Sequence, residues 1–134
     1  MENISINFWA VLVAAVSTFL IGGLWYSPIL FGNAWMKENG FTEEDVKSHS
    51  AARKFGVSFL MALIMAANLA AFLGSEADIT FGATAGFLTG AGWVLTGIAV
   101  IGVFENKSWR YILINGGYHT IAFTVMGVIL GAWH

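Results

Sequence analysis

The sequence predicts an all-α membrane protein, a four-helix transmembrane bundle with a short interfacial amphipathic helix between helices 1 and 2. Two observations predict this class. Of the 134 residues, 57% are apolar and only 10% are charged, whereas a soluble domain is about a quarter charged. The chain also contains four long apolar runs without Asp, Glu, Lys or Arg. Each is close to the roughly 20 residues that a helix needs to cross a bilayer, so we expect a single transmembrane domain over residues 1–134.

The apolar runs set approximate bounds for the four helices, and these are residues 4–27, 55–73, 79–104 and 111–133. The alternating pattern of a membrane β-barrel is missing from them. We expect the second helix to begin earlier than its apolar part, near residue 43, because Thr42 and Asp45 have the spacing of a capping box. The prediction is therefore one continuous helix over about 43–73, of which residues 55–73 cross the membrane.

The first connection is expected to contain a short interfacial helix over about residues 28–39. Ser27 suits an N-cap, Pro28 suits the first helical position, and Gly40 suits the end of the helix. Apolar residues outnumber polar ones between these signals. Such a segment either lies on the membrane surface or continues the first span beyond a kink.

The cations predict the orientation in the membrane. All six Lys and Arg residues fall in the first and third connections, and the remaining connection and both terminal segments contain none. The positive-inside rule places those two basic loops in the cytoplasm. We therefore expect a multi-pass protein of a cell membrane with its N- and C-termini outside.

A polar cluster in the inner half of the bilayer is the candidate site. Asn115, Tyr118 and His119 share one helical face through their spacing of three and four residues. Thr96 lies at nearly the same depth on the third helix, and Trp93 is too deep for an interfacial belt, so we expect it to pack inward. The candidate ligand-binding residues are Trp25, Tyr26, Ser27, Trp93, Thr96, Asn115, Tyr118 and His119.

Two interpretations of this cluster stay open. Its side chains either tie the helices together by hydrogen bonds, or they form a small-ligand or ion site whose titratable group is His119. A water-accessible cavity that reaches His119 would favour the site, whereas a dry, tightly packed centre would favour the structural interpretation.

Small residues at four-residue spacing mark surfaces where helices approach closely in lipid. We expect at least one such face to meet another subunit, because four short-looped helices offer little interior. The chain is therefore expected to form a homo-oligomer; the alternative is packing inside one bundle. The candidate oligomer-interface residues are Gly82, Gly86, Gly90, Gly127 and Gly131.

A short pattern occurs twice in the chain. Phe19-Leu20-x-Gly22-x-x-Trp25 in the first helix recurs as Phe87-Leu88-x-Gly90-x-x-Trp93 in the third. Both helices run in the same direction through the membrane, so the recurrence is compatible with a parallel repeat of two helix pairs.

The segment from Gly22 to Trp35, GGLWYSPILFGNAW, resembles the signature of a family of small four-helix bacterial membrane proteins, the domain-of-unknown-function 1761 family. The last helix resembles it through Gly117-Tyr118-His119, Phe123, Gly127 and the closing Leu130-Gly131-Ala132-Trp133. The resemblance covers nearly the whole chain. It implies the four-span topology and a bacterial inner membrane, and it implies no known chemistry.

Several classes of chemistry lack the residues that they need. The chain has no cysteine, and no acid lies at the depth of His119 to complete a Ser-His-acid triad. His49, His119 and His134 are too scattered to gather round a metal ion. We expect no catalytic residues, no metal, no cofactor and no nucleic-acid partner.

Two functions of different kinds remain. The first is an oligomeric small pore or carrier for a small solute, largely uncharged or aromatic-compatible, at the polar cluster. The alternative is a non-catalytic assembly or lipid-binding membrane subunit, which would act through its glycine faces and the segment from Thr42 to Lys54. An enzyme ranks third, and membrane lipids are the expected partners in every case.

Overall fold

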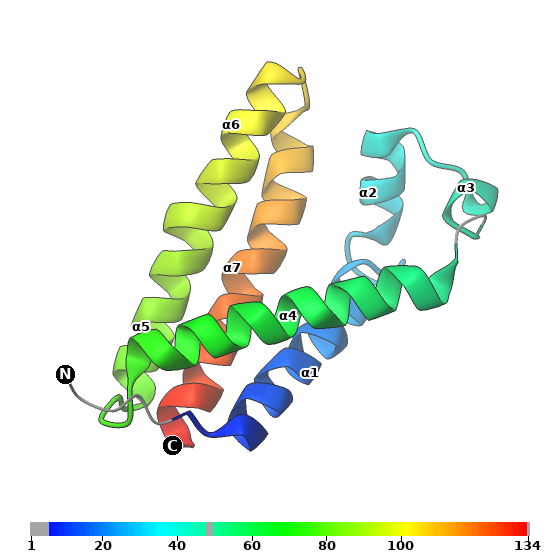
Figure 1. Cartoon of the computed structure of the whole chain (residues 1–134). Helices are drawn as coiled ribbons and strands as arrows, with labels where there is room; N and C mark the ends of the chain where they lie inside the picture. The colour runs from blue at the N-terminus through cyan, green and yellow to red at the C-terminus, as the bar shows by residue number, and fades with distance from the viewer. Residues whose placement is uncertain (1–5, 48–49, 134) are drawn as a thin grey trace.

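The computed structural model describes residues 6–47 and 50–133, and in these ranges the regular structure is entirely helical (Figure 1). The elements, in chain order, are α1 (Phe8–Trp25), α2 (Gly32–Asn39), α3 (Glu43–Lys47), α4 (Ala51–Leu73), α5 (Ile79–Thr89), the π-helix η1 (Gly90–Leu95), α6 (Thr96–Phe104) and α7 (Trp109–Ala132). Elements α5, η1 and α6 form one uninterrupted span. Four spans are long and apolar enough to cross a membrane, and a short helix lies between the first two, so the predicted fold class is confirmed.

Helix α7 lies at the centre of this arrangement and packs against α1, α4, α5, η1 and α6. In its most apolar stretch 39% of the residues are buried, against 11% in the span made of α5, η1 and α6. Helix α4 passes obliquely across α1 and meets α5 near the connection between them (Figure 1). That connection lies at the same end of the bundle as the C-terminus, and the α6–α7 connection lies at the opposite end.

The contact between α5 and α7 brings backbone against backbone. A Cβ atom added at Gly82 would overlap the carbonyl of Gly127, and one added at Gly127 would overlap the carbonyl of Gly82. Gly86 faces the backbone of Phe123 in the same way, and Gly90 faces the backbone of Thr120. These glycines allow the close helix approach that holds helices together in lipid, where apolar area alone gives little driving force.

The π-helix changes which side of the third span faces α7. The positions that contact α7 are Gly82, Gly86, Gly90, Leu95 and Gly102. These positions are four residues apart up to Gly90, and Leu95 follows five residues after Gly90, because a π-helix has one more residue in its turn. Leu95 packs into the space beside Gly116, and Gly102 faces Ile112.

The first span ends at Trp25, and residues 26–31 form a turn between α1 and α2. The sequence predicted that the short helix begins near residue 28 with Ser27 as its cap, but α2 begins at Gly32. Ser27 Oγ instead donates to the carbonyl of Leu24 at 2.7 Å, and the N–H of Gly32 donates to the carbonyl of Ser27 at 2.9 Å. A Cβ atom at Gly32 would overlap the carbonyl of Tyr26, so the turn requires glycine there.

The segment before α4 is partly as predicted. Gly40 ends α2 with φ 67°, and the capping box is confirmed, because Thr42 N–H donates to Asp45 Oδ2 at 2.8 Å and Asp45 N–H to Thr42 Oγ1 at 3.1 Å. The continuous helix over 43–73 is wrong. Ser50 has non-helical backbone with ψ 118°, and its hydroxyl accepts from Arg53 N–H at 3.2 Å, so α4 starts with a cap of its own.

Candidate functional site

The end of α1 and the first half of α7 are joined by three long-range hydrogen bonds. Trp25 Nε1 donates to the carbonyl of Ile114 at 2.9 Å, and Tyr26 OH donates to Asn115 Oδ1 at 2.8 Å. Tyr118 OH donates to the carbonyl of Thr18 at 3.0 Å. The structure therefore brings together four of the predicted site residues, Trp25 and Tyr26 at the end of α1 and Asn115 and Tyr118 on α7.

Two glycines make room for the aromatic rings of this contact. A Cβ atom at Gly22 of α1 would lie 3.3 Å from Tyr118 Cε1, and one at Gly117 of α7 would lie 3.1 Å from Trp25 Cζ2. The Tyr26 and Tyr118 rings meet edge to face with centroids 5.5 Å apart. Each helix thus offers a glycine against which a ring from the other helix packs.

The Asn115 part of the cluster has few free hydrogen-bonding groups. Its Oδ1 accepts from Tyr26, and its Nδ2 donates to the carbonyl of Tyr111 at 3.0 Å. The ring of Trp35 on α2 covers Tyr26 with centroids 5.6 Å apart. These contacts support the structural interpretation for Trp25, Tyr26 and Asn115.

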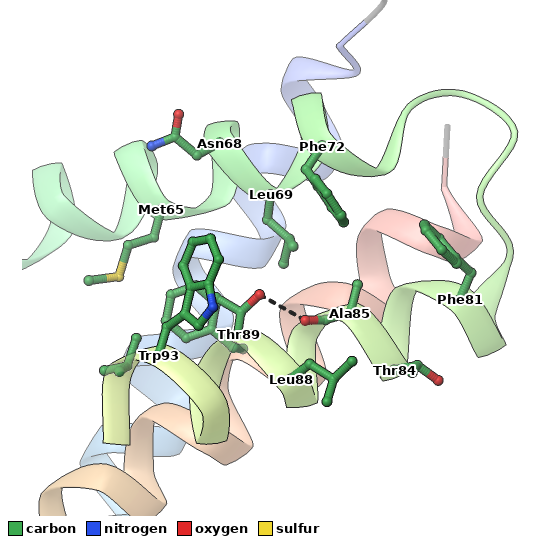
Figure 2. A pocket seen from close by; sticks show the side chains of 12 residues that line it. Met65, Asn68, Leu69, Phe72, Phe81, Thr84, Ala85, Leu88, Thr89 and Trp93 are labelled. Atoms are coloured by element: carbon green, nitrogen blue, oxygen red, sulfur yellow. Dashed lines mark hydrogen bonds between the residues drawn. The ribbon is translucent and has the colours of Figure 1, made fainter. Parts of the chain in front are cut away.

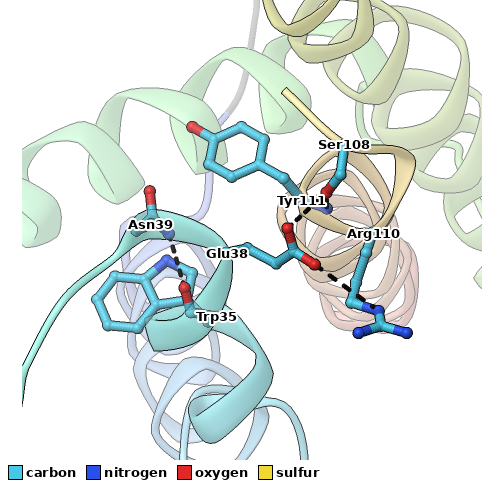
Figure 3. Close-up of polar contacts among 6 residues, drawn as sticks. All are labelled: Trp35, Glu38, Asn39, Ser108, Arg110 and Tyr111. Atoms are coloured by element: carbon cyan, nitrogen blue, oxygen red, sulfur yellow. Dashed lines mark hydrogen bonds and ion pairs between the residues drawn. The ribbon is translucent and has the colours of Figure 1, made fainter. Parts of the chain in front are cut away.

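Helix α2 is fixed to the start of α7 by Glu38 (Figure 3). Ser108 Oγ donates to Glu38 Oε2 at 2.7 Å, and Arg110 Nε lies 3.8 Å from Glu38 Oε1. Asn39 Nδ2 donates to the carbonyl of Trp35 at 2.8 Å and closes the last turn of α2. These polar contacts therefore hold the C-terminal end of α2 beside the first turn of α7.

His119, together with Tyr118 of the same cluster, lines a cavity of about 280 Å³ between α1, α4 and α7. The lining residues are Thr18, Phe19, Val57, Ser58, Met61, Ala62, Met65, Tyr118, His119, Ala122, Phe123 and Met126. The imidazole contacts the rings of Tyr118 and Phe123, with centroids 5.0 and 6.4 Å away. It makes no hydrogen bond to any residue that the structure describes.

Most other polar groups of this cavity already form hydrogen bonds within the protein. Thr18 Oγ1 donates to the carbonyl of Ala15 at 2.7 Å, and the Tyr118 hydroxyl donates to Thr18. Within the described ranges the hydroxyl of Ser58 has no such partner. His119 and Ser58 are therefore the side chains that can offer hydrogen bonds to a bound molecule.

Sequence reasoning missed the residues that α1 and α4 contribute to this cavity. Thr18, Ser58 and Met61 lie far from His119 in the sequence, and no spacing rule connects them. Ser58 did carry a signal, since it is a polar residue inside the apolar run 55–73. That signal alone did not indicate which helix Ser58 faces.

Three predicted site residues lie elsewhere. Trp93 was expected to pack inward, but its side chain is 79% exposed. Thr96 Oγ1 donates to the carbonyls of Gly92 and Trp93 in its own helix, at 2.7 and 3.1 Å, and Ser27 bonds to its own helix as described above. The physical reason for Trp93 and Thr96 is the additional residue in η1, which rotates both positions away from α7.

The glycines predicted to form the oligomer interface are used inside one chain. Gly82, Gly86, Gly90, Gly127 and Gly131 are all buried, and each faces backbone of the same molecule. This packing was the alternative reading of the same pattern. A second copy cannot reach these surfaces, so the homo-oligomer stays a prediction that must rest on other residues.

A second, larger cavity of about 580 Å³ lies between α4 and the span made of α5 and η1 (Figure 2). Its walls are largely apolar. Phe72 and Phe81 lie towards the α4–α5 connection, and Trp93 lies farther from it. The lining residues are Met65, Asn68, Leu69, Phe72, Phe81, Thr84, Ala85, Leu88, Thr89, Trp93, Val94 and Phe123. Trp93 thus belongs to a different cavity from His119.

Among the residues that the structure describes, no three His, Cys, Asp or Glu residues lie close enough together to hold a metal ion. His49 and His134 fall outside the described residues.

Comparison with known proteins adds the family. The family model described as "Protein of unknown function (DUF1761)" matches residues 9–131. The chain belongs to this family. No curated protein and no solved structure matches it. In this DUF1761 protein, the segment 22–35 that resembled the family signature forms the end of α1, the turn that follows and the start of α2.

Proposed function

We propose that this protein is a membrane carrier that binds a small amphiphilic solute in the cavity at His119. The observation that supports this most is the imidazole itself, which lines a cavity of about 280 Å³ and has no hydrogen-bond partner among the described residues. Polar side chains inside a membrane bundle are expensive unless they have a partner. A bound solute would supply that partner.

The size and lining of the cavity limit the solute. At about 30 Å³ per water-sized group, a cavity of about 280 Å³ holds a molecule of roughly nine non-hydrogen atoms. Most of the wall is apolar, with methionine and phenylalanine side chains, and the polar groups are few. An apolar body with one hydrogen-bonding group fits such a wall best.

The position of His119 supports a carrier. Helix α7 has 24 residues, which is about 36 Å of helix, and His119 is about 15 Å from its start. Substrate sites of many transporters lie near the bilayer midplane beside interrupted helices. Here the first span ends at Trp25, and Tyr26 of the turn that follows contacts Tyr118 beside His119.

The orientation belongs to the same proposal. The positive-inside rule would place the α6–α7 connection, with Lys107 and Arg110, in the cytoplasm and the termini outside. Residence in a cell membrane is proposed with it.

The alternative, a non-catalytic lipid-binding membrane subunit, is favoured by the larger cavity of about 580 Å³ between α4 and α5. Its apolar wall suits a lipid chain. Solute binding that depends on residues of the His119 cavity would distinguish the carrier from the lipid-binding subunit, because the two cavities share only Met65 and Phe123.

The test uses 1-octanol as the probe, with the protein in lipid nanodiscs and binding followed by NMR of ¹⁵N-labelled histidine. Met61→Trp fills the His119 cavity from α4, and Ile64→Trp places the same side chain on the same helix outside both cavities. We expect Met61→Trp to weaken octanol binding at least about tenfold, as when a fitted apolar group loses its pocket. Ile64→Trp should bind as the wild type does. Equal binding by all three proteins would contradict the proposed site.

A further inference from the structure

A second, more open space lies beside the cavity at His119, towards the start of α4. Val57 and Ser58 line this cavity and also a more open pocket of about 500 Å³, whose other walls are Ser50, Arg53 and Lys54. The two spaces therefore lie next to each other along α4, and we call the open pocket the mouth. From Arg53 to Met65 the lining follows twelve residues of α4, which is about 18 Å.

The mouth carries two cations, Arg53 and Lys54, that form no ion pair among the described residues. Lys54 Nζ donates to the carbonyl of Val46 at 3.0 Å, which does not neutralise it. Within residues 6–47 and 50–133, no carboxylate lies within ion-pair distance of Arg53 or Lys54, and the ion pair found there joins Arg110 to Glu38. Two adjacent cations at a cavity mouth favour an anionic group at that point.

We propose that the carrier's substrate is a single-chain amphiphile with an anionic head group, bound with its head against Arg53 and Lys54 and its tail in the cavity at His119. This inference rests on the proposed function and names the substrate class for the same site. Guanidinium and ammonium groups bind carboxylate, sulfonate or phosphate oxygens. The tail leaves water for a wall that includes Phe19 and Met61.

Other solutes fit this arrangement less well. A free inorganic anion would bind the two cations but would make no favourable contact with the apolar cavity. A neutral amphiphile would bury its tail in the cavity but would form no ionic contact with the cations. A cationic amphiphile would be repelled by Arg53 and Lys54. A head group that stays ionised, such as a sulfonate, crosses hydrocarbon only slowly by itself, so a carrier would speed its passage.

The experiment compares three probes with the same eight-carbon tail: 1-octanesulfonate, 1-octanol and octyltrimethylammonium. Binding is measured by titration calorimetry with the protein in nanodiscs of zwitterionic lipid. The test variant is Arg53→Gln with Lys54→Gln. The matched control, Lys37→Gln with Lys107→Gln, removes the same charge from residues that line neither space.

We expect the test variant to bind octanesulfonate about tenfold more weakly, the effect of losing one charge-assisted hydrogen bond. Its affinity for octanol should change less than about twofold, because a neutral head makes only weak hydrogen bonds. The control variant should bind both probes as the wild type does, and octyltrimethylammonium should bind more weakly than octanol to the wild type.

The outcomes separate this inference from the proposed function. If Met61→Trp abolishes octanol binding but Arg53→Gln with Lys54→Gln leaves octanesulfonate binding unchanged, the anionic substrate class is wrong and the His119 site stands. If octanesulfonate binding depends on the two cations but not on Met61, the anion binds only at the surface and the inference is overturned. Uptake of octanesulfonate into proteoliposomes supports a carrier, and its absence would overturn the carrier while leaving the binding site.

Discussion

Helix α7 meets its neighbours through two faces that use glycine in opposite ways. Towards α5 and η1, glycines such as Gly82 and Gly127 remove side chains so that two backbones touch. Towards α1, Gly22 and Gly117 each make room for one aromatic ring from the other helix. The first face packs without an intervening layer of side chains, whereas the second leaves the cavity at His119 where α4 joins it. A glycine in a membrane helix therefore does not by itself indicate what it contacts.

The recurring Phe-Leu-x-Gly-x-x-Trp pattern shows the same contrast. Both glycines, Gly22 and Gly90, face α7 within residues 118–120. The tryptophan that follows Gly22 bonds to α7, but the one that follows Gly90 points away and is 79% exposed. The difference arises because η1 is a π-helix, whereas α1 keeps α-helical geometry through Trp25.

The largest expected effect comes from breaking the backbone contact. Gly127→Ala should destabilise the bundle by about 3 kcal/mol, because overpacking of this kind forces the backbones apart. Gly97→Ala is the matched control, since a Cβ atom there meets nothing within 4 Å, and it should be neutral or slightly stabilising. Unfolding in mixed detergent with SDS measures both. Equal stability of the two variants would mean that α5 and α7 are not this close.

An intermediate effect is expected on the aromatic face. Trp25→Phe removes the hydrogen bond to Ile114 and part of the packing against Gly117, and should lower the free energy of unfolding by about 1 kcal/mol. Trp93→Phe makes the same chemical change in the other copy of the pattern and should have an effect below about 0.5 kcal/mol. The same unfolding assay measures both, and a larger loss for Trp93→Phe would reverse the comparison.

The smallest effect is expected at the polar anchor of α2. Glu38→Gln weakens the contacts with Ser108 and Arg110, and since Arg110 is 64% exposed, solvent screening limits the loss to about 0.5 kcal/mol. Hydrogen exchange of the α2 amides is the sensitive measurement, and it should become faster in this variant. Glu43→Gln, on the neighbouring α3, serves as the control and should leave α2 exchange unchanged.

A large part of the fold could be predicted from the sequence, and about half of the site. The spans, the capping box at Thr42 and the meeting of α1 with α7 through Tyr26, Asn115 and Tyr118 follow from local patterns. Trp93 and Thr96 were misplaced because α-helical spacing was applied across a π-helix. The glycine face was assigned to a second subunit because the four-residue spacing shows that small residues share one face. It does not show which helix packs against that face.

The sequence by itself determined that the chain crosses a membrane in four helices, because a bilayer of fixed thickness demands apolar runs of that length and a chain with few charges cannot coat itself for water. It also determined the capping box at Thr42 and the end of α2 at Gly40, which depend on neighbours within a few residues. Only the tertiary structure decided which glycines touch backbone and which accept a ring. It alone also joined Ser58 and Met61 of α4 to His119 of α7 around one cavity, since such contacts depend on how tilted helices cross and not on any local spacing.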